Sequence, residues 1–235
     1  TLIKNVKIVN EGKIFKGDIR INHEKITSIA SSISVLQNDN VVDGNDKFII
    51  PGLIDDQVHF REPGLTNKGD MFSESRAAVA GGITSFIEMP NTNPQTTSMK
   101  NIEQKIDIAS KNSVANYGFM FGGTNSNLDE IKKIDEKKVA GLKLFLGSST
   151  GNMLVNKKKV IKEIFKSSKL VISVHCEDEL IIKKNLNHYF EIYGKNIPFK
   201  FHPSIRSAEA CFKSSSEAIK LALETGARLH VFHLS

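Results

Sequence analysis

Two patterns of hydrophobic and polar residues divide the sequence near residue 50. Residues 1–50 hold short alternating runs such as "LIKNVKIV", "GDIRIN" and "KITSIA", separated by Gly, Asn and Asp, which is typical of β-strands joined by turns. We predict a small antiparallel β module there. In residues 51–235, apolar strands alternate with helical segments, and this alternation predicts a second domain in which helices surround a parallel sheet.

The second domain is predicted to contain six strands, each followed by polar residues. The strands are expected within residues 53–60, 83–90, 114–121, 140–147, 170–176 and 228–235, and the helices within 72–80, 99–111, 128–136, 155–166, 179–193 and 207–225. Parallel α/β folds build their sites at the C-terminal ends of such strands. Because no glycine-rich phosphate loop follows the first strand, the fold class favoured is a (β/α)8 TIM-type barrel, of which about six βα units are present.

Composition and charge exclude several classes of function. No apolar run among the 235 residues approaches the length of a membrane span, and the N-terminus lacks the apolar core of a signal peptide, so we expect a cytoplasmic protein without membrane contact. Cys176 and Cys211 are too few for a disulfide framework and are interpreted as small buried hydrophobic residues. The net charge of +6 comes from lysines interleaved with acids on helix faces, so no nucleic-acid partner is expected.

Four residues able to bind a metal are predicted at or near the ends of four different strands. His59, His175 and His233 end or follow apolar runs, and Lys143 lies inside the apolar "GLKLFLG". Desolvation of an unpaired ammonium there should lower the lysine pKa. Imidazole is a preferred zinc ligand, and a neutral lysine can take up carbon dioxide as a carbamate able to bridge two metal ions. The other histidines are expected to bind no metal: His23 in the β module, His188 on a helix, His202 in a loop, and His230 facing away from His233.

The segment "DDQVHFREPG" carries candidate residues on one side of an extended strand. Alternation places Asp55, Gln57, His59 and Arg61 together. The rigid fork of Arg61 suits a substrate carboxylate, and the amide of Asn91, after the second strand, is expected to complete that clamp. Asp55 is expected to orient a metal ligand. Gln57 stands where a second histidine would suit a metal site, and its amide oxygen is a poorer zinc ligand than imidazole.

These motifs carry a resemblance to a known family. "PGLIDDQVHFREPG", "MPNTNP", "GLKLFLG", "VHCED" and "HLS", in this order along the chain, resemble the cyclic amidohydrolases of the dihydroorotase type. The resemblance implies a distorted barrel with one or two zinc ions and a β-sandwich built from both chain ends. It also implies that His59 and carboxylated Lys143 hold one ion, and that Lys143, His175 and His233 hold the other.

The same resemblance implies an activity and partners. The activity is the reversible, zinc-dependent hydrolysis of the cyclic amide of dihydroorotate to N-carbamoyl-aspartate in pyrimidine biosynthesis. The implied assembly is a homodimer that is able to associate with other enzymes of that pathway. The substrate clamp formed by Arg61 and Asn91 fits this reaction, because dihydroorotate carries a carboxylate.

Two departures from the family pattern leave alternatives open. Gln57 replaces the first histidine of the family's HxH pair, which weakens or empties the metal position beside it. The family's catalytic aspartate follows the eighth strand, beyond Ser235, so we expect no catalytic residue of that kind here and a longer parent polypeptide. The alternatives are a non-catalytic dihydroorotase-like scaffold, and another cyclic amidohydrolase of the allantoinase or dihydropyrimidinase type.

Overall fold

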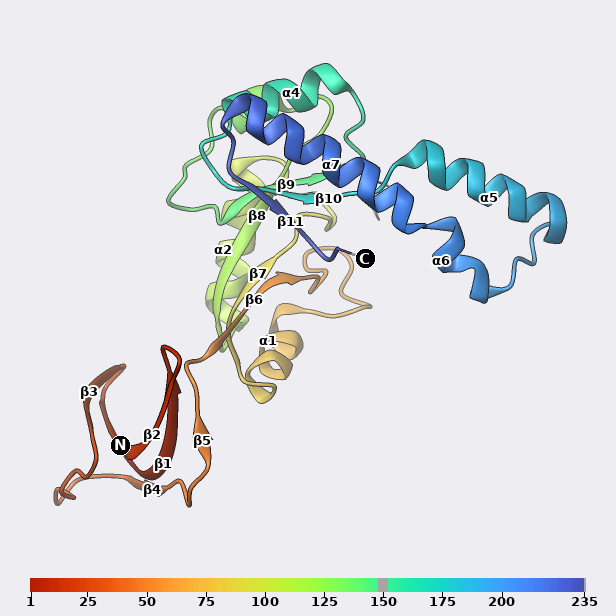
Figure 1. The fold of residues 1–235 in the computed structure, drawn as a ribbon. Helices are drawn as coiled ribbons and strands as arrows, with labels where there is room; N and C mark the ends of the chain where they lie inside the picture. The colour runs from red at the N-terminus through yellow and green to blue at the C-terminus, as the bar shows by residue number, and fades with distance from the viewer. Residues whose placement is uncertain (148–151, 235) are drawn as a thin grey trace. The chain divides into compact units, whose positions relative to one another are not determined.

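A computed structural model describes residues 1–147 and 152–234, and its contacts divide the chain into a first unit, residues 1–53, and a second unit, residues 54–235. The first unit is one five-stranded sheet in the order β3-β2-β1-β4, with β5 also on β1 (Figure 1). Its strands are β1 (Leu2–Asn10), β2 (Lys13–Asn22), β3 (Lys25–Ala30), β4 (Val41–Asp43) and β5 (Phe48–Ile49). Val6, Ile8 and Ile19 form its small core.

The expectation of a purely antiparallel module is wrong. Strands β1, β2 and β3 are antiparallel, whereas β4 and β5 pair with β1 in parallel. After β3 the chain returns through residues 31–40 to the start of β1, so that Leu2 pairs with Val41. A connection of this length permits a parallel pairing that a tight hairpin would forbid.

The second unit contains a six-stranded sheet in the order β11-β10-β9-β8-β7-β6, in which each strand lies beside the next strand of the chain. The strands are β6 (Leu53–Val58), β7 (Ile83–Glu88), β8 (Asn116–Gly122), β9 (Gly141–Phe145), β10 (Ile172–His175) and β11 (Leu229–Val231). The α/β class and the succession of strands expected for a barrel are confirmed, and β7 to β11 pair in parallel. The sheet is curled, because side chains of its two outermost strands meet: Oδ2 of Asp56 on β6 lies 3.3 Å from Nε2 of His230 on β11.

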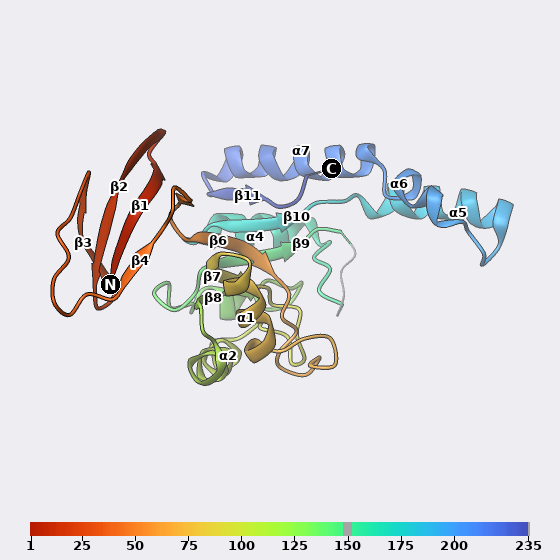
Figure 2. The same cartoon turned by 90° about the horizontal axis from the view of Figure 1, so that it is seen from below.

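Helices lie along this sheet, except that α5 (Glu179–Tyr193) and α6 (His202–Ile205) extend away from it (Figures 1 and 2). They are α1 (Met71–Ala80), α2 (Met99–Asn112), α3 (Leu128–Ile131), α4 (Lys158–Ser167), α5 (Glu179–Tyr193), the 3-10 turn η1 (Phe199–Phe201), α6 (His202–Ile205) and α7 (Ala208–Thr225). The side chains of Asp70, Ser98, Asp178 and Ser207 accept backbone N–H groups at the first turns of α1, α2, α5 and α7. No described helix combines the length and apolar character needed to cross a membrane.

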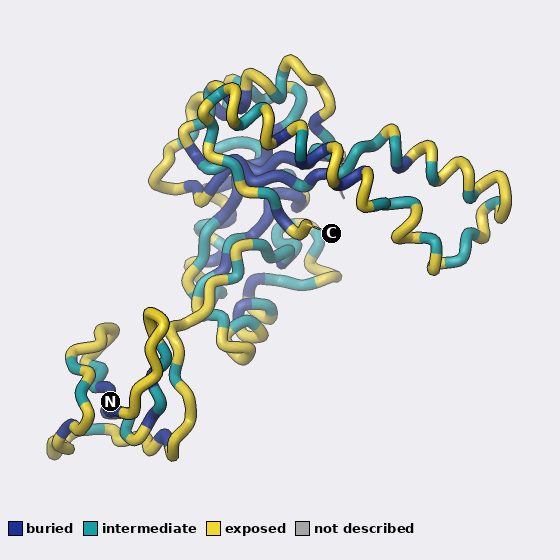
Figure 3. Tube along the Cα trace, viewed as in Figure 1, coloured by how far each residue is buried: buried dark blue, intermediate teal, exposed yellow. Residues whose placement is uncertain are grey.

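The main core lies between the sheet and its helices, and the buried strands are seen in Figure 3. Leu142 and Leu144 of β9 belong to this core. Because side chains alternate along a strand, Lys143 between them points to the opposite face of the sheet. There its ammonium lies 4.2 Å from the ring centroid of Phe232, which packs with Met89 and Met120. The lysine therefore faces the inner side of the curled sheet.

Two predicted helices are shorter than their apolar patterns suggested. The helix expected over 128–136 ends at Ile131. The helix expected over 155–166 begins at Lys158, because Val155 is held in an extended segment by a hydrogen bond from its backbone N–H to the carbonyl of Phe145 at 2.8 Å. Val155 fits the helical spacing of apolar residues in the sequence, but it is buried beside a strand and is not part of the helix.

His202 and Arg61 also differ from expectation. His202 is not in a loop but begins α6, where Pro203 is tolerated because the first turn of a helix does not need its N–H group. The extended strand does not reach Arg61, since β6 ends at Val58 and Arg61 has a φ of 70°. Alternation along a strand therefore cannot fix the direction of the Arg61 side chain.

Candidate metal centre

Two imidazoles face each other where β10 and β11 end. His175 is the last residue of β10, and His233 follows β11. Nδ1 of His175 lies 3.3 Å from Nε2 of His233. Nε2 of His175 lies 2.7 Å from Oε2 of Glu177. Because a carboxylate accepts, Nε2 carries the proton, and the lone pair of Nδ1 is presented toward His233.

The separation of these two nitrogens has the value that a metal would require. Zinc binds imidazole nitrogen at about 2.0–2.1 Å in tetrahedral geometry, so two such nitrogens lie about 3.3 Å apart. The observed distance is 3.3 Å. Burial also lowers the pKa of His175, and a neutral imidazole is the form that binds metal. The spacing fits a hydrogen bond between the two rings and equally fits two imidazoles on one tetrahedral zinc ion.

Lys143 is a buried basic side chain in an apolar part of this site. It is fully buried on β9, and its Nζ is among the buried polar atoms without a hydrogen-bond partner in the described part of the chain. Burial lowers its pKa to about 7, with the rings of Phe145 and Phe232 as its neighbours at 4.9 and 4.2 Å. The charge of Lys143 lowers the pKa of both His59 and His175, which places it within electrostatic reach of each.

His59 is held by a different partner from the other two histidines. Its Nδ1 lies 2.8 Å from Oδ1 of buried Asn91. An amide oxygen only accepts, so Nδ1 carries the proton and Nε2 keeps a free lone pair. Burial, followed by the charge of Arg61, lowers the pKa of His59 to about 4, and the ring is neutral at pH 7. Asn91 thus orients His59.

Arg61 lies against a buried ion pair. Its Nη1 is buried without a hydrogen-bond partner among the described residues, which is costly for a charged donor. Behind it, Glu88 of β7 pairs with Lys105 of α2, and Lys105 also donates to the carbonyl of Met89 at 2.9 Å. Burial raises the pKa of Glu88 to about 7, against the opposing charge of Lys105 and the backbone N–H of Arg61. The ion pair of Glu88 and Lys105 thus supports the starts of two loops, the one after β6 that carries Arg61 and the one after β7 that carries Asn91.

Gln57 and Asp55 lie next to the site on β6. Both are half-buried, whereas Ile54 and Asp56 are exposed, so the alternation expected of this strand is present. Oδ1 of Asp55 accepts the backbone N–H of Gln57 at 3.0 Å, and Asp55 thus stabilises the strand just before His59. Across residues 1–147 and 152–234, no three His, Cys, Asp or Glu side chains converge as a complete metal site.

The sequence did not reveal two residues of the site. Glu177 contacts His175 and also pairs with Arg206, whose Nε lies 2.9 Å from Oε1. Glu177 stands in "VHCED", two residues after the histidine, and that spacing is the only signal that could have pointed to it. Arg206 follows α6, 29 residues further along the chain, and nothing in its local sequence marks it.

Comparisons with known proteins identify a family for this chain. A family model described as dihydro-orotase-like matches residues 46–235. The chain is 31% identical to a dihydroorotase of Methanosarcina mazei over 99% of its own length and 51% of that protein. It is 31% identical to an allantoinase of Desulfitobacterium hafniense, over 100% of this chain and 53% of that protein.

One solved structure extends the agreement to the fold. L-hydantoinase (dihydropyrimidinase) from Arthrobacter aurescens matches with a TM-score of 0.92 at 29% identity, covering 100% of this chain and 52% of that one. This chain therefore spans about half the length of the relatives that it matches.

Proposed function

Because the chain belongs to the dihydro-orotase-like family, we propose that its protein is a dihydroorotase, which hydrolyses the cyclic amide of dihydroorotate reversibly to N-carbamoyl-aspartate. The observation that supports this most directly is the pair of imidazole nitrogens of His175 and His233, 3.3 Å apart as zinc ligands should be. Lys143 of the neighbouring strand β9, whose Nζ has no hydrogen-bond partner among the described residues, is proposed as a third ligand. These residues fit the metal that the family implies.

The metal ligands are proposed as two sets. Lys143, His175 and His233 hold one zinc ion, and His59 with Lys143 holds a second, more weakly because Gln57 offers only an amide oxygen. Bound zinc supplies Lewis acidity, which polarises an amide carbonyl and lowers the pKa of water. Asn91 and Glu177 keep His59 and His175 in the tautomers that leave Nε2 and Nδ1 free, respectively.

Carboxylation of Lys143 is part of the proposal. A pKa of about 7 leaves a substantial share of this amine neutral at pH 7, and the neutral amine is the nucleophile that takes up carbon dioxide. In that step an N–C bond forms, one C–O π bond of carbon dioxide breaks with its electron pair moving to oxygen, and the nitrogen releases one proton. The product is an anion, which removes the conflict between a buried cation and its apolar neighbours Phe145 and Phe232 once zinc ions neutralise it.

Arg61 is the basis of the proposed substrate specificity. Its buried Nη1, which has no hydrogen-bond partner in the part of the chain that the structure describes, and the amide hydrogens of Asn91 are donors, and a carboxylate is the acceptor they suit. Dihydroorotate carries such a carboxylate, whereas hydantoin and dihydropyrimidine rings do not. The likeness to L-hydantoinase keeps a hydantoin-type ring as a second candidate substrate.

Zinc content and substrate preference test the proposal together. The full-length protein, prepared without chelator, should contain zinc and should hydrolyse dihydroorotate faster than hydantoin or allantoin. Arg61→Ala should lower kcat/KM for dihydroorotate by about 100-fold, since a charged hydrogen bond to a buried group is worth about 3 kcal/mol. Arg228→Ala, which removes an exposed arginine bonded to the carbonyl of Lys169, is the control. A zinc-free folded protein, or equal rates for Arg61→Ala, would refute the corresponding part.

Location and assembly are proposed on narrower grounds. Cys176 and Cys211 are free and buried, which suits the reducing conditions of the cytoplasm, and we place the protein there. A homodimer and contacts with other enzymes of pyrimidine biosynthesis follow only from the family. Size-exclusion chromatography with light scattering would measure the first directly.

A further inference from the structure

A carboxylate links a metal-ligand candidate to a distant arginine. Oε2 of Glu177 accepts Nε2–H of His175 at 2.7 Å and also a hydrogen bond from Arg206. Oε1 of Glu177 accepts Nε–H of Arg206 at 2.9 Å, so the arginine contact is bidentate. The side chains of Glu177 and Arg206 are 13% and 31% exposed, and a shielded fork of this kind fixes the plane of the carboxylate.

Arg206 reaches this position only because the segment before it folds. Residues 179–206, which we call the excursion, leave the sheet as α5 and return through η1 and α6 (Figure 1). Nδ2 of Asn185 on α5 donates to the carbonyls of Ser204 and Ile205, both at 3.2 Å. Tyr189 and Tyr193 pack on Phe201, with ring centroids 4.6 and 5.1 Å apart. The two arms of the excursion are thereby joined just before Arg206.

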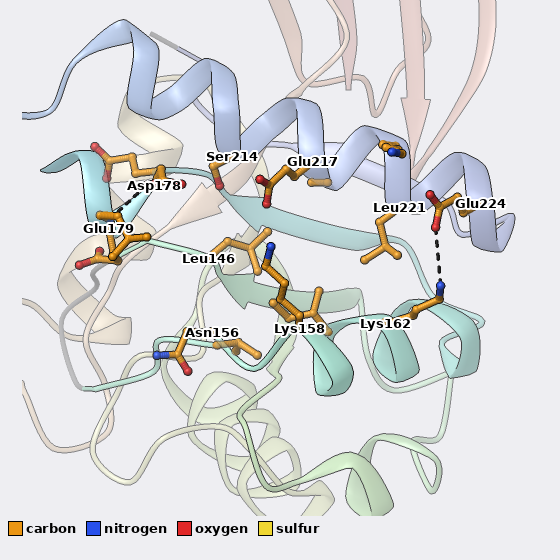
Figure 4. Close-up of a pocket in the computed structure, with 16 residues that line it drawn as sticks. Leu146, Asn156, Lys158, Lys162, Asp178, Glu179, Ser214, Glu217, Leu221 and Glu224 are labelled. Carbon is orange, nitrogen blue, oxygen red and sulfur yellow. Dashed lines mark hydrogen bonds and ion pairs between the residues drawn. The ribbon is translucent and has the colours of Figure 1, made fainter.

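Without Arg206, the Glu177 carboxylate could turn away from His175. Glu177 also lines a cleft of about 550 Å³ between α4 and α7. Asp178 and Glu179 lie at one end of this cleft and Glu217 lies on its α7 side (Figure 4). The same cleft is lined by Lys158, Lys162 and Lys220, so a carboxylate without the Arg206 contact has open space and other cations toward which it can turn. The bidentate contact with Arg206 holds it toward His175.

We propose that Arg206 and Glu177 are a positioning pair that fixes the tautomer and direction of the His175 imidazole, so that metal binding depends on the folded excursion. The inference rests on the proposed zinc centre, to which it adds two residues and a remote segment. Neither residue touches the metal or the substrate. Their effect passes through one hydrogen bond to Nε2 of His175.

Zinc affinity of the full chain is the first measurement, by competition with a chromophoric chelator. Removing an outer partner of a metal-bound histidine typically lowers metal affinity 10- to 100-fold. We expect a loss of about that size in Glu177→Gln and in Arg206→Gln, and a smaller one in Arg206→Lys, which keeps the charge but not the fork. Lys213→Gln is the matched control, because Lys213 of α7 pairs at 2.8 Å with Asp178, the residue that follows Glu177.

The tautomer of His175 is the second measurement, and a purely structural role would not move it. In metal-free protein, nitrogen-15 NMR of the imidazole should show the proton on Nε2 in the wild type and a mixture of tautomers in Glu177→Gln. Circular dichroism should show equal helix content in all variants. Wild-type zinc affinity and an unchanged tautomer in both Glu177→Gln and Arg206→Gln would overturn the positioning pair. Absence of zinc binding in the wild type would instead refute the proposed centre itself.

Discussion

Each unit of the molecule buries a charged side chain. The one in the first unit has hydrogen-bond partners, whereas the one in the second unit has none among the described residues. In the first unit, Asp18 accepts backbone N–H groups of Asn5 and Ile33 at 3.0 and 2.9 Å and pairs with Lys4 at 3.1 Å. In the second unit, Lys143 is fully buried and its Nζ has no hydrogen-bond partner in the described part of the chain. A satisfied buried charge fixes a fold, whereas an unsatisfied one costs free energy that only another function can justify.

The contrast lies in partners and not in burial alone. Lys105 is as buried as Lys143 and belongs to the same unit, yet it is paired with Glu88 and with the carbonyl of Met89. The second unit is therefore able to satisfy a buried ammonium. Lys143 lies in the middle of β9, level with Ser173 of β10, and its Nζ has no hydrogen-bond partner among the described residues.

Lys105→Met should give the largest loss of stability, about 3–5 kcal/mol, because it leaves Glu88 buried without its cation. Urea unfolding followed by circular dichroism measures the free energy of unfolding. Lys111→Met is the control, since Lys111 and Asp107 form an exposed pair on the same helix that contributes less than about 1 kcal/mol. Equal losses in the two variants would contradict the assigned role of the Glu88 pair.

Asp18→Ala should destabilise the first unit by about 2–3 kcal/mol, because two backbone N–H groups and Lys4 lose a charged acceptor together. Hydrogen exchange resolved by residue is the suitable measurement, because it separates the units. Faster exchange is expected in β1 and β2, with β8 to β10 unchanged. Uniform acceleration across both units would show that Asp18 does not act locally.

Lys143→Met should have the opposite sign and raise the stability of metal-free protein by about 1–2 kcal/mol. Methionine matches the length of the lysine stem and removes a desolvated, unpartnered nitrogen. The same variant should lose most of its zinc affinity, which chelator competition measures. A destabilised variant would mean that Lys143 has a structural partner after all.

The pH dependence of the first unit should show the smallest effect. The backbone N–H groups of Asn5 and Ile33, and then Lys4, hold the pKa of Asp18 below its ordinary value of 3.8. For an acid with a lowered folded pKa, the stabilisation is present above pH 3.8 and is lost as the pH falls below it. Protection factors in β1 and β2, which are corrected for the intrinsic exchange rate at each pH, should therefore fall from pH 5 to pH 2.5 more in the wild type than in Asp18→Asn.

The sequence predicted the features that local patterns determine. Alternating strands and helices gave the α/β class, and chemistry at the strand ends selected His175 and His233, which the structure brings into contact. Lys143 was recognised because a charge inside an apolar strand is exceptional on any fold. These inferences needed only the periodicity of a strand and the cost of burying a charge.

Features that depend on the return of the chain could not be predicted in this way. The contact of Arg206 with Glu177 spans 29 positions and requires the folded excursion. The parallel pairing of β4 with β1 depends on the path of residues 31–40. The direction of Arg61 depends on its φ of 70°, which lies outside the strand geometry on which the alternation argument relied.

The aromatic packing within the excursion also gives the protein its own optical reporter. The chain has no tryptophan and three tyrosines. Two of these, Tyr189 and Tyr193, pack on Phe201, and the third, Tyr117, lies on β8 beside Phe119. Tyrosine fluorescence of this chain will therefore report mainly on the excursion, and replacing Tyr117 with Phe leaves a signal from that segment alone, without any attached dye.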